Sequence, residues 1–180
     1  ETLDQFLQRS GKIPPDEACH IVYQALRGLD CIFKQGLVHR DLKPANMMLA
    51  GLGPTSNVID KTLKILDMGL GKLTKHKEPV HQVATALHLT DEGVILGTPD
   101  YMAPEQAVDA RNIDIRADIY SLGCVLYHLL TGQCPFPDTN IVNQMIRHAT
   151  EVPKLASQFN SRVPEGSNKI ISTMLAKKPS

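Results

Sequence analysis

Hydrophobic residues recur at helical spacing along most of the chain. The clearest amphipathic helix is predicted at residues 16–35, where acidic residues stand at the start and Gly36 follows the end. Its apolar stripe consists of Ala18, Val22, Ala25, Leu26, Leu29, Ile32 and Phe33. Residues 117–131 are apolar nearly all round, which predicts a buried helix. Further helices are expected at 2–9, 139–149 and 167–176, the last two with Thr139 and Ser167 as N-caps.

Strands are predicted in one place. Short apolar runs at 47–49 and 63–66 flank a stretch rich in Gly, Pro and Asn, which favours a two-stranded hairpin with a loop longer than a tight turn needs. Residues 70–98 are polar and weakly periodic, and a stretch of this length in a compact domain is either functional or disordered. The expected fold class is mainly α with a small β-hairpin, in one domain over residues 1–180.

Composition and charge exclude some classes of function. The 180 residues suffice for one domain, and 42% of them are hydrophobic, so a core is possible. Lys plus Arg (19) balance Asp plus Glu (19) and Trp is absent, so no nucleic-acid surface is expected. No apolar run approaches the roughly 20 residues that span a bilayer, so no membrane segment is expected in this chain.

The cysteines indicate the compartment. Cys19 and Cys31 would lie roughly 18 Å apart on one helix, which is too far for a disulfide. Cys124 stands in an apolar run, and the chain has no CxxC pair. Free thiols favour a reducing compartment, and we expect a cytoplasmic location.

Residues 39–46, HRDLKPAN, place chemically useful side chains close together. Asp41 comes five residues before Asn46, and Lys43 lies between them on the same side as Asp41 if the loop is extended. Such a loop can present a base, a cation and a metal ligand. Asp67 follows the second apolar run and precedes Met68 and Gly69, a suitable place for a Mg²⁺ ligand.

Two more segments complete an ordered set: GTPDYMAPE at 97–105 and DIYSLG at 118–123. Together the four segments resemble the HRDxKPxN, DFG, GTxxYxAPE and DxxSLG signatures of protein kinases, and their surroundings are similar to bacterial eukaryotic-like Ser/Thr kinases. The resemblance covers essentially the whole chain. It implies the C-terminal lobe of the protein kinase fold, with an activation segment at 67–105 and no N-terminal lobe in these residues.

The resemblance also implies the chemistry. A Ser/Thr protein kinase transfers the γ-phosphate of ATP to a Ser or Thr hydroxyl of a protein substrate, with ATP and Mg²⁺ as cofactors. Asp41 corresponds to the base that orients this hydroxyl, and Lys43 to the contact with the γ-phosphate. Asn46 and Asp67 correspond to the Mg²⁺ ligands. Lys43 at this position resembles the Ser/Thr-specific subfamily more than the tyrosine kinases.

Other matching positions have supporting roles in the family. The resemblance implies that His39 packs in a hydrophobic spine and bonds near Asp67, and that Asp118 anchors the backbone of the catalytic loop. Arg40 would bind a phosphorylated activation loop, because phosphate pairs strongly with guanidinium. The remaining family positions are the candidate phosphate acceptors Thr85 and Thr90, the unmodified hydroxyl of Thr98, and Glu105, whose expected Arg partner lies beyond residue 180.

The chain departs from the family pattern in several ways. Met68 replaces the usual Phe, and no glycine-rich phosphate loop or VAIK-type Lys precedes the catalytic loop. We therefore expect residues 1–180 alone to have little activity and to expose an apolar patch where the N-terminal lobe would dock. The alternative is a non-catalytic kinase-like lobe that serves as a protein-binding or scaffold module. The spacing of His76, His81 and His88 matches no usual zinc site.

Overall fold

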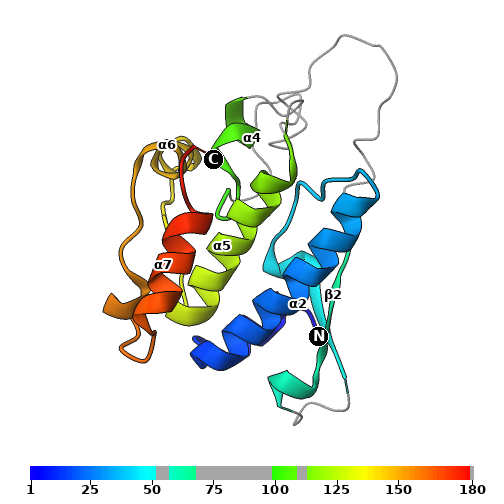
Figure 1. Cartoon of the computed structure of the whole chain (residues 1–180). Helices are drawn as coiled ribbons and strands as arrows, with labels where there is room; N and C mark the ends of the chain where they lie inside the picture. Colours follow the sequence, from blue (N-terminus) through cyan, green and yellow to red (C-terminus); the bar gives the residue numbers. More distant parts are fainter. Residues whose placement is uncertain (52–56, 68–98, 109–112, 179–180) are drawn as a thin grey trace.

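The computed structural model describes residues 1–51, 57–67, 99–108 and 113–178. Within these ranges the protein is mostly helical with one two-stranded sheet (Figure 1). The elements are the helices α1 (Leu3–Ser10), α2 (Pro15–Lys34), α4 (Pro104–Val108), α5 (Ile115–Thr131), α6 (Ile141–Thr150) and α7 (Glu165–Met174), the strands β1 (Met47–Ala50) and β2 (Thr62–Ile65), and the 3₁₀ turns η1 (Pro44–Asn46), η2 (Val58–Asp60) and η4 (Ala156–Gln158).

The helix α5 lies at the centre of the molecule. Figure 1 shows α2 on one side of α5 and α7 on the other, with the hairpin flanking α2. The two strands are antiparallel, and Met47 pairs with Ile65 while Ala50 pairs with Thr62. This arrangement confirms the predicted fold class, because the hairpin and the long helices lie where the apolar pattern placed them.

The ends of the helices follow from local sequence. Thr2 and Gln5 form a capping box at the start of α1. Asp114 caps α5 by accepting a hydrogen bond from the backbone N–H of Arg116. The helix α5 ends at Gly132, whose φ of 78° is in the left-handed region that glycine adopts most easily.

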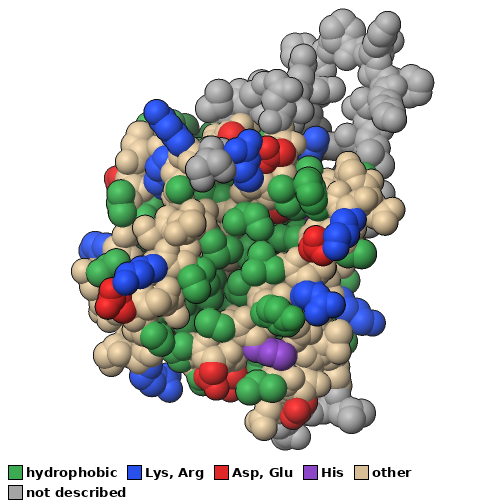
Figure 2. Space-filling model, in the orientation of Figure 1, with side chains coloured by type: hydrophobic (Ala, Val, Ile, Leu, Met, Phe, Trp, Pro, Cys, Tyr) green, Lys and Arg blue, Asp and Glu red, His purple; other side chains and the backbone are tan. Residues whose placement is uncertain are grey.

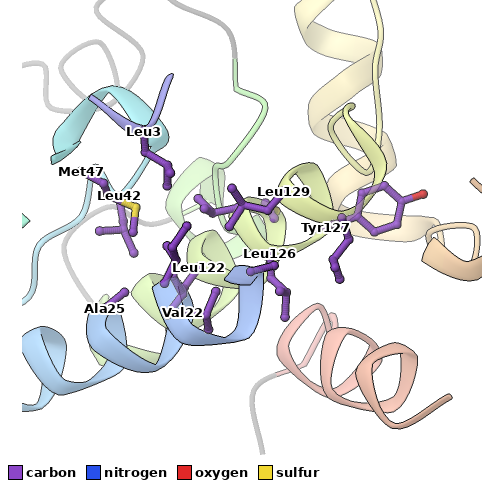
Figure 3. Close-up of a cluster of buried hydrophobic side chains, with 14 of the residues drawn as sticks. Leu3, Val22, Ala25, Leu42, Met47, Leu122, Leu126, Tyr127 and Leu129 are labelled. Atoms are coloured by element: carbon purple, nitrogen blue, oxygen red, sulfur yellow. The ribbon is translucent and has the colours of Figure 1, made fainter. Parts of the chain in front are cut away.

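The core joins the central helices to the loop that precedes β1. Leu42 and Met47 are 2% and 0% exposed, and they bracket the segment that carries Lys43 and Asn46. Figure 3 shows both side chains in the same apolar cluster as Leu3 of α1. Because both anchors are in close-packed surroundings, the backbone between them is held at both ends.

Several details of the prediction were wrong. The N-caps are Asn140 for α6 and Pro164 for α7, so Thr139 and Ser167 do not cap these helices. Leu26 is 39% exposed, so it lies outside the core. Phe33 is 53% exposed, because the neighbours of α2 cover a narrower face than the apolar stripe occupies. The short helix α4 was not predicted.

Apolar side chains remain exposed on the surface. Figure 2 shows them gathered in the middle of one face, around α5 and between α7 and α2. The large exposed apolar residues on the helices are Tyr23, Leu26, Phe33, Val142, Ile146 and Ile170. That such a patch docks a further lobe stays a prediction. In the described ranges, no helix is long and apolar enough to cross a membrane, and Cys19, Cys31, Cys124 and Cys134 are free thiols.

Candidate active site

The start of the loop at residues 39–46, the candidate catalytic loop, is attached to the buried helix α5. Asp118, in the first turn of α5, is 0% exposed and accepts backbone hydrogen bonds from His39 and Arg40, both at 2.8 Å. Burial raises the pKa of Asp118, and the two hydrogen bonds act in the opposite direction. The hydrogen bonds expected between Asp118 and the backbone of this loop are therefore present, and the catalytic role of the loop stays a prediction.

Two residues of the site have an unusual backbone conformation. Among the described residues, Arg40 (φ 69°) and Asp67 (φ 50°) are the non-glycine residues with positive φ. This conformation costs of order 1–3 kcal/mol and persists where surrounding contacts enforce it. One of these residues directly precedes Asp41 and the other is the candidate metal ligand, so both strained positions fall within the candidate site.

His39 connects the loop at residues 39–46 to the segment after β2. Its ring is 0% exposed, and Nδ1 accepts a 3.3 Å hydrogen bond from the backbone N–H of Asp41. Since Nδ1 acts as the acceptor, the proton lies on Nε2, which donates to the carbonyl of Leu66 at 2.8 Å. The expected bond next to Asp67 is thus present, and one imidazole ring spans both segments.

Asp41, Lys43 and Asn46 converge within this loop. Lys43 Nζ lies 2.9 Å from Asp41 Oδ2, which agrees with their expected placement on the same side. The Asn46 side-chain amide donates to the Asp41 carbonyl at 2.8 Å and to Oδ2 of its carboxylate at 3.0 Å. Because the nitrogen of Asn46 faces Asp41, its Oδ1 points away from that carboxylate and is the atom suited to a cation.

The hairpin brings the residue before Asp67 into contact with Asn46. The backbone N–H of Leu66 donates to the carbonyl of Asn46 at 2.8 Å, directly before Asp67. The Asp67 side chain is exposed. One carboxylate and one amide oxygen suit Mg²⁺, a hard cation usually bound by one or two carboxylates together with substrate phosphates. The donor set of Asp67 and Asn46 therefore fits that ion.

The remaining predicted positions divide into two groups. Met68, Thr85, Thr90 and Thr98, like the three histidines between them, lie outside the described residues. Glu105 is half-buried in α4. The pKa of Arg116 is raised chiefly by its hydrogen bond to Asp114, and Glu105 adds to the shift in the same direction. The proposed pairing of Glu105 with an Arg beyond residue 180 stays a prediction.

The segment before α4 is held by contacts that the sequence did not reveal. Gln144 of α6, which is 0% exposed, donates to Asp100 at 2.5 Å. The Tyr101 hydroxyl and His128 Nδ1 lie 2.7 Å apart. The available signal was His128, which interrupts the apolar stretch at residues 122–130 of α5, because polar side chains in packed surroundings are normally hydrogen-bonded. These contacts fix residues 99–103 against α5 and α6.

Comparison with known proteins identifies the family. The protein kinase domain family matches residues 1–180. Serine/threonine-protein kinase PknB of Mycobacterium leprae is 32% identical over 178 residues, which are 99% of this chain and 26% of that protein. Serine/threonine-protein kinases drp72 of Corynebacterium efficiens is 36% identical over 179 residues, with 99% and 30% covered. The chain therefore belongs to the protein kinase domain family, and it spans about a quarter to a third of these relatives.

Proposed function

We propose that residues 1–180 form the C-terminal lobe of a Ser/Thr protein kinase that transfers the γ-phosphate of ATP to a protein hydroxyl. The observation that carries this proposal is the convergence of Lys43 and Asn46 on the carboxylate of Asp41. The names of the bacterial relatives, all Ser/Thr protein kinases, support the same activity. In this proposal residues 67–105 form the activation segment.

Each polar side chain has a distinct task in the proposed reaction. The Asp41 carboxylate orients the substrate hydroxyl and accepts its proton. Lys43, already paired with Asp41, neutralises charge on the γ-phosphate. Asn46 Oδ1 and the Asp67 carboxylate would hold Mg²⁺, which when bound offsets the negative charge of the ATP phosphates. The protein thus acts mainly by positioning and charge.

Control of the activity is proposed to act through Arg40. This residue directly precedes Asp41, so a phosphate on Thr85 or Thr90 that paired with its guanidinium would also order the base. Thr98 would then act as an unmodified hydroxyl near the base. A cytoplasmic location of this segment belongs to the same proposal, because ATP and a reducing environment occur together there.

The proposed activity requires more than these residues. No glycine-rich phosphate loop or VAIK-type Lys occurs in residues 1–180, so we expect the isolated segment to transfer no phosphate above its Asp41→Asn variant. The competing function is a scaffold that binds partners without catalysis. Residues encoded immediately before Glu1 separate the two functions, since a glycine-rich loop followed by an AxK strand favours the enzyme.

The decisive experiment measures phosphate transfer by the full-length protein. The purified protein is incubated with γ-labelled ATP, Mg²⁺ and a Ser/Thr-rich protein substrate, and compared with Asp41→Asn. We expect the variant to lose roughly 10²–10⁴-fold in rate. Asp60→Asn, at an exposed position in η2, is the matched control and should keep full activity. Equal rates for the wild type and Asp41→Asn would refute the proposed function and favour the scaffold.

A further inference from the structure

The side-chain amide of Gln106 connects α4 to the catalytic loop, because its oxygen and its nitrogen each make a hydrogen bond. The side chain is 8% exposed. Its Oε1 accepts a 3.0 Å hydrogen bond from the backbone N–H of Ala103. Its Nε2 donates a 2.7 Å hydrogen bond to the backbone carbonyl of Arg40, which is 66 residues away in the sequence. No family signature quoted above includes this contact.

The carbonyl that Gln106 binds belongs to the peptide bond leading into Asp41. The N–H of the same peptide bond donates to His39 at 3.3 Å. Since a peptide bond is planar, holding its oxygen and its nitrogen fixes the plane from which Asp41 departs. Asp118 binds the N–H of Arg40, on the other side of that residue. Gln106 therefore supplies a contact that Asp118 does not.

The strained conformation of Arg40 makes this contact important. A φ of 69° is unfavourable for a residue with a side chain, and neighbouring contacts must enforce it. Without a donor at its carbonyl, the peptide between Arg40 and Asp41 can rotate toward a relaxed conformation. Such a rotation would move the carboxylate of Asp41, and a displacement of about 1 Å can cost 10²-fold in rate.

We propose that Gln106 is a positioning residue that orients the Arg40–Asp41 peptide and thereby presents the Asp41 carboxylate to the substrate hydroxyl. This inference rests on the proposed kinase function. It also couples α4 to the base, because any movement of α4 that withdraws Gln106 releases the peptide. Gln106 itself touches neither the hydroxyl nor the phosphate.

A purely structural role for Gln106 is the competing explanation. Gln106 is the third residue of α4 and reaches back to the N–H of Ala103, which precedes the helix, as the acidic or amide residue of a capping box does. Capping uses Oε1, whereas positioning uses Nε2. The two roles therefore depend on different atoms and can be separated by mutation.

Gln106→Glu separates the roles because it is nearly isosteric. The carboxylate still accepts from Ala103, and a negative charge suits the start of a helix. When ionised it has no proton to donate to the Arg40 carbonyl. When protonated it regains a donor, and burial favours this neutral form. The deficit of Gln106→Glu relative to the wild type should therefore shrink as the pH falls.

The test uses the full-length protein and steady-state kinetics between pH 6 and 8. For Gln106→Glu at pH 8 we expect kcat to fall about 10- to 100-fold, with the KM for ATP and the melting temperature close to wild type. We expect the kcat ratio to recover by at least threefold at pH 6. Gln158→Glu, an exposed position in η4, is the matched control and should show neither effect. A wild-type kcat for Gln106→Glu would overturn the inference.

A second variant keeps the inference testable if Gln106→Glu does not fold. Gln106→Met removes both hydrogen bonds without adding charge. Positioning predicts a lower kcat with an unchanged KM at temperatures well below melting, whereas capping alone predicts a wild-type kcat with a lower melting temperature. The variant Asp41→Asn separates the two proposals. If its kcat equals that of the wild type, the kinase function is refuted. If Asp41→Asn loses activity but the Gln106 variants keep the wild-type kcat, only the present inference is refuted.

Discussion

Asp118 accepts a 2.8 Å hydrogen bond from the backbone N–H of Arg40, a residue 78 positions earlier in the chain. The other carboxylate oxygen of Asp118 accepts a hydrogen bond of the same length from the backbone N–H of His39. A buried charge is costly unless it is compensated by hydrogen bonds. The start of the loop at residues 39–46 is therefore attached to α5, and the Asp118 side chain contributes both to the stability of the fold and to the geometry of the candidate site.

The first prediction concerns Asp118→Asn. An Asn side chain has one oxygen acceptor, so either His39 or Arg40 loses its backbone partner. An unsatisfied buried N–H costs about 1–3 kcal/mol, and we expect the free energy of unfolding in urea to fall by this amount. Asp30→Asn is the control, because it removes an exposed ion pair with Lys34. It should change the free energy of unfolding by less than about 0.5 kcal/mol. If Asp118→Asn lowers the free energy of unfolding by less than about 0.5 kcal/mol, Asp118 does not stabilise the fold through these two hydrogen bonds.

The second prediction concerns Mg²⁺ and Asp67. Asp67→Asn replaces a charged oxygen ligand by a neutral one, so the Mg²⁺ concentration for half-maximal phosphate transfer by the full-length protein should rise at least about tenfold. Chelation of divalent cations should abolish the activity of the wild type. The control is Lys64→Gln, at an exposed position of β2 near Asp67. An unchanged Mg²⁺ requirement in Asp67→Asn would exclude Asp67 as a metal ligand.

The sequence predicted the parts of the fold that depend on local pattern. The apolar run at residues 117–131 predicted α5, and the two short apolar runs at 47–49 and 63–66 predicted the hairpin. The width of the buried face of α2 was not predictable, because Leu26 and Phe33 are exposed only as a result of which neighbours pack there. The caps of α6 and α7 were misplaced because Thr139 and Ser167 are intrinsically good caps that the chain does not use.

The site was predictable to the extent that its residues are close in sequence. Asp41, Lys43 and Asn46 lie on one short loop, and their spacing alone placed them together. The contact of Gln106 with Arg40 joins residues 66 positions apart, and no periodicity indicates such a pair. The link between Asp100 and Gln144 was missed for the same reason.

The third prediction concerns the packing of α5 against α7. A Cβ atom on Gly123 would lie 2.8 Å from Cβ of Met174 and 3.1 Å from Cδ2 of Leu175, so a side chain there forces the helices apart. We expect Gly123→Ala to destabilise the protein by about 1–3 kcal/mol in urea unfolding. Gly166→Ala in α7 is the control, because its added Cβ would meet no atom within 4 Å apart from its chain neighbours and the nearby backbone of its own helix.

The control should respond in the opposite direction. Alanine is favoured over glycine in a helix by up to about 1 kcal/mol, so Gly166→Ala is expected to be neutral or stabilising. If Gly123→Ala is equally harmless, the two helices are not in the close contact described. Melting temperatures of both variants, measured beside the wild type, provide an independent comparison of the two positions.

The last prediction concerns pH and His148. This residue of α6 is 2% exposed, and its Nδ1 lies 3.0 Å from the hydroxyl of Tyr120. Burial lowers the pKa of His148 to about 3, and the nearby charges of Lys177 and Arg147 act in the same direction. An unfolded histidine has a pKa of about 6.5, so the unfolded state binds this proton first as the pH falls.

His148 should therefore destabilise the fold progressively as the pH falls from about 6.5 toward about 3. The free energy of unfolding should lose up to about 1.4 kcal/mol per pH unit from this group. His148→Gln removes the titration, so urea unfolding at pH 7.5, 6 and 5 should show a smaller loss in the variant. Above pH 7.5, where histidine is neutral in both states, the two proteins should have the same pH dependence. Equal losses between pH 6 and 5 would show that His148 is protonated at the same pH in the folded and unfolded chain.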